Sequence, residues 1–323
     1  MEAEVLIQNE ILFGNLLLEM IPHPNGFLGN LLNILTIICH YLAGITTFVV
    51  MIPFIYFFYN SRFGIKMAVA VLSTGILNGF EKYIFSSPRP VDLSSQFNEI
   101  GSIIKESSFG FPSGHSHISI LIWGMIYIRF KNIYIRVVSL FFIIFTPFSR
   151  MYAGVHYPGD VIGGFFSGLI SLIIIEWFFS RYPSFPSPND WARAKSSVKS
   201  SSLAVIAFTL SFLLLDDTST NEKNTLVQII SASGSMAGLY IGLVRWKLNY
   251  SNYDIEDCKF IRTFLLLGLT IIALYVGLGR LSELFIKDSL IFRYIRYFTL
   301  NYSIIYIVPY LSLVILGEKE NPV

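Results

Sequence analysis

Long runs of apolar residues, separated by short polar breaks, dominate the chain from Leu31 onwards. A helix needs about 20 mostly apolar residues to cross the hydrocarbon core of a bilayer, and about nine runs approach this length. The pattern therefore predicts an all-α fold, a polytopic transmembrane helical bundle of about nine spans. The predicted spans are Leu31–Tyr59, Ile65–Phe85, His115–Phe130, Ile133–Phe148, Val161–Phe179, Val198–Leu215, Leu226–Val244, Phe260–Leu278 and Tyr297–Leu316.

Two segments depart from this apolar pattern. Residues 1–30 include an apolar stretch interrupted by Glu10 and Glu19, which a spanning helix would not accommodate, so they predict an interfacial N-terminal segment. Residues 181–200 contain a polar, proline-containing stretch and predict a cytoplasmic linker. The chain is thus divided into the N-terminal segment, a transmembrane core over 31–180, the linker, and a C-terminal transmembrane region of four spans over 201–323.

Composition supports a membrane protein and excludes several other classes. The chain is 54% hydrophobic and 14% charged, with a mean hydropathy of +0.61, which no ordinary water-soluble domain carries. A formal net charge of +2 gives no overall positive potential that would hold nucleic acid. The expected partners are therefore membrane lipids, and no nucleic acid is expected. Cys39 and Cys258 fit neither a disulfide framework nor a zinc site, and we expect both to be packing residues. The sequence does not indicate an oligomeric state.

The distribution of positive residues predicts the orientation, because cytoplasmic loops collect Lys and Arg. Most of the 23 Lys and Arg residues fall on one side, in the connections near Arg62, Lys131, Arg193 and Lys247, and the first 61 residues contain none. We therefore expect an integral membrane protein, of a bacterial inner membrane, with its N-terminus outside and its C-terminus in the cytoplasm.

Three polar segments lie at the ends of predicted spans, where ionisable groups are costly unless they serve a function. By the span assignment, all three face the same, extracytoplasmic side. They are Lys82-x6-Arg89-Pro90, Pro112-Ser113-Gly114-His115 and Ser149-Arg150-x5-His156-x3-Asp160.

These residue types suit the transfer of a phosphoryl group. Lys82, Arg89 and Arg150 supply three cations for a tetrahedral oxyanion, and a helix beginning near Ser113 and Gly114 would add backbone N–H donors. His156 is placed to attack phosphorus, and Asp160 is placed to fix the tautomer of His156. His115 is placed to protonate the departing alcohol. Because phosphoryl transfer depends mainly on positioning and neutralisation of charge, fixed cations can replace a metal, so we expect neither a metal nor another cofactor.

The three segments resemble the signature motifs of the type 2 phosphatidic acid phosphatase superfamily, in order and at the family's spacing over about 80 residues. The resemblance implies the superfamily's helical catalytic core within residues 31–180 and does not cover the last four spans. It implies His156 as nucleophile, His115 as acid and Asp160 as supporting carboxylate. It also implies that the phosphate is bound by Lys82, Arg89, Ser113, Gly114 and Arg150.

The leading hypothesis is a metal-independent phosphatase of a lipid phosphate monoester or diphosphate, acting through a phosphohistidine. Phosphatidate, phosphatidylglycerophosphate, isoprenyl diphosphate, sphingoid-base phosphate and lipid A phosphate all remain possible substrates. The alternatives are a lipid phosphotransferase, a phosphatase of a soluble phosphate ester, and a non-enzymatic transporter or scaffold. Vanadium haloperoxidases share the cradle but resemble soluble helical proteins, which these apolar runs disfavour.

Other residues near the motifs receive structural interpretations. His117 would point away from His115 on a helix, and His40 in the first span is expected to be a buried hydrogen-bonded residue. Between Ser86 and Phe111, apolar residues alternate with Glu99, Lys105 and Glu106 as in a short amphipathic helix. We interpret this segment as a candidate lid whose apolar face contacts the lipid tail.

Overall fold

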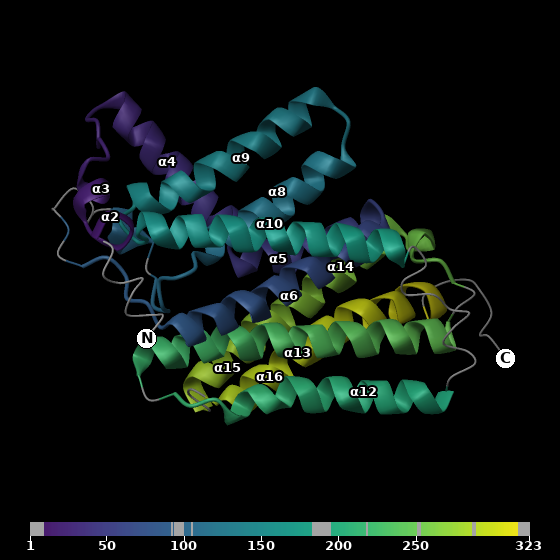
Figure 1. Ribbon diagram of the computed structural model, residues 1–323. Helices are drawn as coiled ribbons and strands as arrows, with labels where there is room; N and C mark the ends of the chain where they lie inside the picture. The colour runs from purple at the N-terminus through teal and green to yellow at the C-terminus, as the bar shows by residue number, and fades with distance from the viewer. Residues whose placement is uncertain are drawn as a thin grey trace. The chain divides into compact units, whose positions relative to one another are not determined.

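The computed structural model describes residues 10–91, 93, 100–104, 106–182, 195–217, 219–250, 253–285 and 289–315. Within these residues the chain forms helices and no strand, as Figure 1 shows, so the all-α prediction is confirmed for the described part. The α-helices are α2 Glu10–Phe13, α3 Leu16–Glu19, α4 Phe27–Leu42, α5 Ile45–Phe58, α6 Ser61–Phe85, α8 Gly114–Arg129, α9 Ile133–Tyr152, α10 Pro158–Arg181, α12 Lys195–Leu210, α13 Thr220–Asn249, α14 Phe260–Thr270, α15 Leu278–Phe285 and α16 Leu290–Tyr302. Short 3₁₀ segments lie at η1 Ser211–Leu214 and η2 Ile255–Asp257, and π-helical segments at η3 Ile271–Gly277, η4 Ser303–Ile307 and η5 Tyr310–Ile315.

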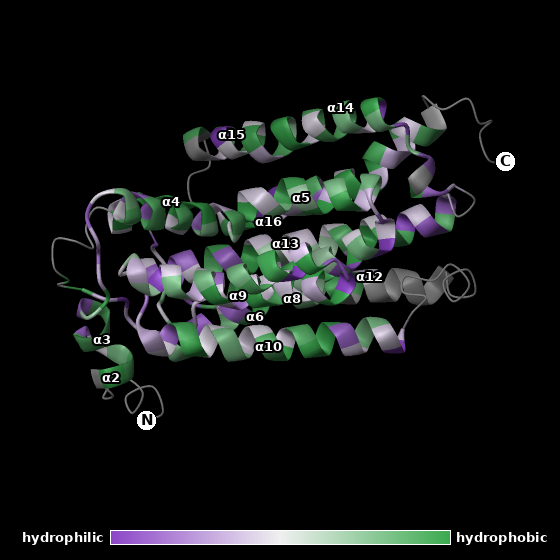
Figure 2. Cartoon of the chain, turned by 90° about the horizontal axis from the view of Figure 1, so that it is seen from above, coloured by the Kyte–Doolittle hydropathy of each residue, from purple (hydrophilic) through white to green (hydrophobic). Residues whose placement is uncertain are grey.

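Among the described residues, five helical segments are long and apolar enough to cross a membrane by length and composition, and six if the bent pair of α4 and α5 is one span. The five are Ser61–Phe85, Ile133–Tyr152, Pro158–Arg181, Thr220–Asn249 and Phe260–Ser282, each of which contains a predicted span. Hydrophobic residues run along most of α5 and α14 in Figure 2. The predicted count of about nine spans is not confirmed, since α8 has 16 residues and the apolar helix Val205–Leu214 is also short.

The predicted first span, Leu31–Tyr59, is not one straight helix. It contains most of α4 and all of α5, which are bent by 61° at a short break over Ala43 and Gly44. At the break, the Tyr41 carbonyl accepts from the Gly44 backbone N–H at 3.0 Å and from the Thr47 hydroxyl at 2.7 Å. The apolar composition continues through the break, so hydropathy alone did not reveal it.

The described residues belong to two compact units. One contains 1–48, 77–178 and 216–226, and the other contains 49–76, 179–215 and 227–323. The second unit has an apolar core of buried side chains that includes Leu239, Trp246, Tyr297, Leu300 and Val308. The predicted domain boundaries stay a prediction, and residues 183–194 of the predicted linker lie outside the described part.

In the first unit, α10 packs closely against α8. A Cβ on Gly164 would lie 2.4 Å from the Ser113 carbonyl oxygen, and one on Gly168 would lie 2.7 Å from that of His117. The small-residue spacing Gly164-x3-Gly168 therefore allows the two backbones to approach, as such spacings do in lipid. This approach places the start of α10 beside the start of α8.

The N-terminal segment forms two short helices instead of one. Leu18 of α3 is fully buried and packs with Tyr157 at the entry to α10, together with Phe13 and Ile21. The segment is therefore anchored against the turn between α9 and α10. Residues 1–9 lie outside the described part.

Candidate active site

The three polar segments predicted from the sequence meet in the first unit. Lys82 lies in the last turn of α6, and Arg89 follows in the extended segment after that helix. Ser113 is the N-cap of α8, and its backbone N–H donates to the Asp160 carbonyl at 2.9 Å, tying the start of α8 to the start of α10. Lys82, Arg150, His156 and Asp160 are each at most 2% exposed.

His156 and Asp160 form a pair across the turn that opens α10. Nδ1 of His156 lies 3.1 Å from Oδ2 of Asp160, and the same oxygen accepts from the Tyr157 backbone N–H at 2.9 Å. Nε2 of His156 lies 3.0 Å from Nη1 of Arg89. Because an ionised carboxylate only accepts and a guanidinium only donates, the ring carries its proton on Nδ1 and a lone pair on Nε2. This is the tautomer that a nucleophilic imidazole requires.

Arg89 connects the histidine to the segment that precedes α8. Its Nε donates to the Ser108 carbonyl at 2.7 Å, and Nη1 donates to the Val155 carbonyl at 2.8 Å. Nη2 lies 3.3 Å from Oε2 of Glu106. The guanidinium is thus held in one orientation beside His156.

Lys82 contacts the same segment as Arg89. Its Nζ donates to the Ser108 hydroxyl at 3.3 Å and to the Phe109 carbonyl. Arg89 Nη2 also lies 3.3 Å from that carbonyl. The backbone at residues 108 and 109 is therefore shared by two cations.

Arg150 lies in the last turn of α9 and contacts α4. Its Nη1 donates to Nδ1 of His40 at 3.2 Å, and Nη2 reaches the Thr36 carbonyl at 3.5 Å. The His40 ring in turn stacks on the ring of His115, with centroids 5.0 Å apart. The expected hydrogen bond of His40 agrees with this, whereas the residue is only partly buried and its contact with the site was not predicted.

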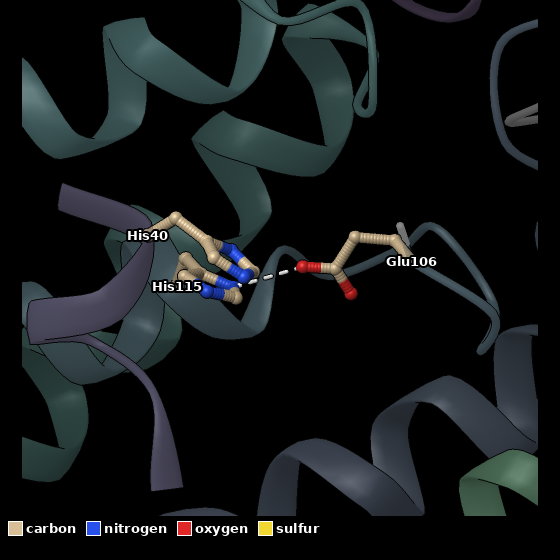
Figure 3. A group of neighbouring side chains, drawn as sticks. All are labelled: His40, Glu106 and His115. Carbon is tan, nitrogen blue, oxygen red and sulfur yellow. Dashed lines mark ion pairs between the residues drawn. The ribbon is translucent and has the colours of Figure 1, made fainter. Parts of the chain in front are cut away.

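Glu106 is the second residue that the sequence reasoning missed. Its Oε1 lies 3.3 Å from Nδ1 of His115 and 3.9 Å from Nη1 of Arg150, while Oε2 contacts Arg89. Figure 3 shows the carboxylate reaching the edge of His115 while the His40 ring covers a face. The signal that could have found it is charge balance, since three cations, two of them buried, require a counter-charge and Glu106 lies between the first two motifs.

Comparisons with known proteins identify the family of the segment that carries these residues. A family model described as the PAP2 superfamily matches residues 63–183, which include all eight predicted site residues and Glu106. The chain contains a PAP2 superfamily domain. The resemblance inferred from the three motifs is therefore confirmed, whereas His40 lies before the matched range.

The chain is also similar to phosphatidylglycerophosphatase B of Bacillus subtilis (strain 168), with 27% identity over 139 residues. The matched part is 40% of this chain and 64% of that protein, so the chain spans a little under two thirds of the length of this relative. No solved structure gives a significant match.

Two groups of the PAP2 domain that lie between helices have strongly shifted pKa values. Burial would raise the pKa of Glu106, but His115, Arg89, Lys82 and Arg150 together lower it to about 2. Burial, followed by the charges of Arg89, Lys82 and Arg150, lowers the pKa of His156 well below its usual value. Near neutral pH the domain therefore contains an ionised glutamate and an uncharged His156.

Ser113 and Gly114 form the start of α8 in the PAP2 domain. The Ser113 hydroxyl accepts from the Ser116 hydroxyl at 3.1 Å and from its backbone N–H at 3.5 Å. At Gly114 a Cβ would lie 2.9 Å from Oδ1 of Asn78, so glycine allows that side chain to approach. Both residues thus have structural contacts at this helix start, and their binding of phosphate stays a prediction.

His117 points away from His115 in the PAP2 domain, as the helical spacing predicted. Its Nε2 lies 2.9 Å from the Ser171 hydroxyl, and its Nδ1 lies 3.8 Å from Oε2 of Glu81. Glu81 in turn accepts from the Ser167 hydroxyl at 2.9 Å. This second, partly buried polar cluster connects α6, α8 and α10, and none of these contacts involves His115.

The segment interpreted as a lid packs partly inside the PAP2 domain. Ile100 and Ile104 are buried and pack with Tyr152, Ala153 and Val155, whereas Ile103 is 54% exposed. The expectation that its apolar face contacts lipid is therefore wrong for Ile100 and Ile104, because both are covered by the chain after α9. Glu99 and Lys105 lie outside the described residues.

His40, Glu106 and His115 each offer one ligand atom, and these atoms lie within 4.8 Å of one another, a spacing that a metal ion can use. The charges nearby argue against a cation, because Arg89 and Arg150 already contact this group. A divalent ion would meet two guanidinium groups at close range in a partly buried setting. The carboxylate of Glu106 fits better as the counter-charge of the arginines.

Proposed function

We propose that this protein is a phosphatase of a lipid phosphate monoester or diphosphate, acting through a phosphohistidine. The observation that carries the proposal is the arrangement around His156, with Asp160 at Nδ1, Arg89 at Nε2 and two further cations nearby. The PAP2 domain and the similarity to a phosphatidylglycerophosphatase support the same reaction class. The apolar helices favour a substrate whose tail stays in the bilayer.

In the proposed first step, Nε2 of His156 attacks phosphorus and the bond between phosphorus and the lipid oxygen breaks. Lys82, Arg89 and Arg150 neutralise the charge on the non-bridging oxygens, and the N-terminus of α8 adds its positive dipole. His115 gives its Nε2 proton to the departing lipid oxygen, so the lipid leaves as an alcohol or a lower phosphate. Asp160 stabilises the ring of His156 as it becomes positively charged.

In the second step, a water attacks the phosphohistidine. Neutral His115 takes a proton from this water at Nε2, the bond between nitrogen and phosphorus breaks, and inorganic phosphate leaves. The buried Nε2 of His115 has no hydrogen-bond partner among the described residues, which suits an atom that exchanges protons with substrate oxygen and with water.

The placement of the site also belongs to this proposal. The excess of Lys and Arg in the opposite connections supports an extracytoplasmic active site and a cytoplasmic C-terminus. The Bacillus relative supports a bacterial membrane. A lipid phosphotransferase, a phosphatase of a soluble ester and a transporter or scaffold are the outcomes that an experiment must separate.

The test is release of inorganic phosphate by the purified protein in detergent, with and without a chelator. The panel contains phosphatidate, phosphatidylglycerophosphate, an isoprenyl diphosphate, a sphingoid-base phosphate and a soluble sugar phosphate. We expect release from at least one lipid, persistence in chelator, and loss of release in His156→Ala with retained binding of the lipid. Release from the sugar phosphate alone, loss in chelator, or full turnover by His156→Ala would contradict the proposal.

A further inference from the structure

The connection between α6 and α8 carries a carboxylate into a cluster that the three motifs supply mainly with cations. Glu106 contacts Arg89 and His115 at 3.3 Å each, and Arg150 at 3.9 Å. The side chains of Arg89, Glu106 and His115 are each 15–17% exposed, so they lie at the least buried part of the cluster. None of the three motifs contains this glutamate.

We propose that Glu106 is a positioning residue for His115. Its carboxylate accepts a hydrogen bond from the N–H at Nδ1 of His115, which leaves Nε2 of that ring to exchange a proton with the substrate. The inference rests on the proposed function, in which His115 is the acid and then the base. Under it, each of the two histidines has its own carboxylate. Asp160 faces Nδ1 of His156, and Glu106 faces Nδ1 of His115.

The position of Glu106 is fixed by its neighbours in the fold. Ile104, two residues earlier, is fully buried against the chain that follows α9, and Lys82 and Arg89 hold the backbone at residues 108 and 109. The carboxylate thus lies between two anchored points of the same connection. A residue fixed in this way can orient a neighbouring ring.

The unpaired buried atoms of the two residues support a hydrogen bond that His115 donates and Glu106 accepts. Oε1 of Glu106 and Nε2 of His115 are both buried atoms without a hydrogen-bond partner among the described residues. Two side-chain nitrogen atoms of basic residues lie within 4 Å of Oε1 of Glu106 in the described part of the chain: Nδ1 of His115 at 3.3 Å and Nη1 of Arg150 at 3.9 Å. Catalytic contacts of this length shorten when substrate binds, and a buried carboxylate oxygen requires a donor.

The charge state of Glu106 is compatible with the same role. Its pKa of about 2 keeps it ionised over the working range, so it can only accept from His115. The groups that face His115 are Glu106 from the connection, His40 from α4, and Arg89 and Arg150 from the other motifs. Glu106 is the only one of these four that favours the protonated ring needed to donate to a leaving group.

The experiment compares two substrates that differ in the leaving group. An alkyl phosphate lipid needs a proton on its departing oxygen, whereas 4-nitrophenyl phosphate, with an acidic alcohol, needs little help. We expect Glu106→Gln to lower kcat/KM for the alkyl lipid by about tenfold to a hundredfold, and for the nitrophenyl ester by less than about threefold. His115→Ala should show the same bias, and Glu106→Gln should have little further effect in that background.

The pH profile gives an independent readout. Removing the negative charge makes the His115 ring easier to deprotonate, so the basic limb of kcat/KM should move to lower pH in Glu106→Gln. Glu106→Asp keeps the charge and should leave that limb near its wild-type position. Glu81→Gln is the matched, partly buried control, because Glu81 contacts Ser167 and His117 and not His115. It should show no leaving-group bias.

Several results would overturn the inference. Three results for Glu106→Gln would do so: equal losses of kcat/KM on both substrates, an effect on KM alone, or wild-type activity. Each would show that Glu106 only balances the charge of the arginines. If Glu106→Gln does not fold, Glu106→Asp decides by the same comparison, since a shorter side chain should still show the bias. Failure of the wild-type protein to release phosphate from either substrate would instead count against the proposed function.

Discussion

His40 and His115 lie face to face, with ring centroids 5.0 Å apart and planes inclined by 14°. His40 also accepts from Arg150 at its Nδ1, so one ring of α4 contacts both the proposed acid and one of the proposed phosphate ligands. The two side chains are 75 positions apart in the sequence. The finding connects α4, which precedes the matched PAP2 region, to the chemistry of the site.

His40→Ala should lower kcat/KM without abolishing turnover. Loss of the stacked ring and of one contact to Arg150 removes about 1 kcal/mol each, about 2 kcal/mol together, which corresponds to a decrease of about thirtyfold. His40→Phe keeps the stacked ring and should recover part of the loss. Steady-state kinetics on a lipid phosphate provides the measurement. Equal activity of the alanine variant and the wild type would show that the stacking has no catalytic consequence.

Asp160→Asn should nearly abolish formation of the phosphoenzyme. The amide can donate to Nδ1 of His156, which would place the ring proton on Nε2 and remove the lone pair that attacks phosphorus. We expect kcat to fall by about 10³ to 10⁴, as in other enzymes where an orienting aspartate becomes asparagine. Rapid acid quench with labelled substrate measures the phosphoenzyme. Activity within threefold of the wild type would contradict the assigned role.

Gly164→Ala should destabilise the protein and displace its site. The new Cβ would lie 2.4 Å from the Ser113 carbonyl oxygen, and Ser113 cannot move freely because its N–H is bonded to Asp160. Overpacking of this kind costs about 1–3 kcal/mol. The melting temperature in detergent and kcat should both decrease. The matched control is Gly268→Ala, where a Cβ meets nothing within 4 Å, and which should keep both values.

Stability should decrease in two steps as the pH falls. The folded-state pKa of His156 is lowered, so the unfolded chain binds a proton first, and stability is lost as the pH drops below the usual histidine range near 6.5. Glu106 has a pKa of about 2, so its contribution is present above the usual glutamate value near 4.3 and is lost between that value and about 2.

Thermal melting in detergent from pH 8 to pH 3 measures both steps. His156→Gln should reduce the fall in melting temperature below about pH 6.5, and Glu106→Gln should reduce the fall below about pH 4.3. A melting temperature that rises on acidification through either window would contradict the corresponding shift.

Helix positions were largely predictable because lipid imposes a length and an apolar composition on every segment that crosses it. The predicted runs around Ile65, Ile133 and Val161 coincide with α6, α9 and α10. The bend between α4 and α5 was not predictable, since the residues at the break are themselves apolar or small. The three motifs could be predicted because each is local and has fixed spacing.

No local pattern indicates the roles of His40 and Glu106, because these roles depend on contacts between distant segments. His40 meets Arg150 across 110 positions, and a histidine inside an apolar run has no periodicity that indicates its partner. Glu106 stands in a connection that alternates polar and apolar residues, where nothing local distinguishes it from other solvated acids. Only the folded chain brings both residues to His115.

The backbone carbonyls of Ser108 and Phe109 accept hydrogen bonds from Arg89 and Lys82, two of the three cations assigned to phosphate binding. Under the proposed function, an arriving phosphate would exchange with the protein's own oxygen atoms, and its net affinity would be the difference between two sets of contacts. Such an exchange weakens retention of free inorganic phosphate after the reaction. It also makes the amide protons near Phe109 and Gly110 a gauge of occupancy, since hydrogen exchange there should change when the anion enters.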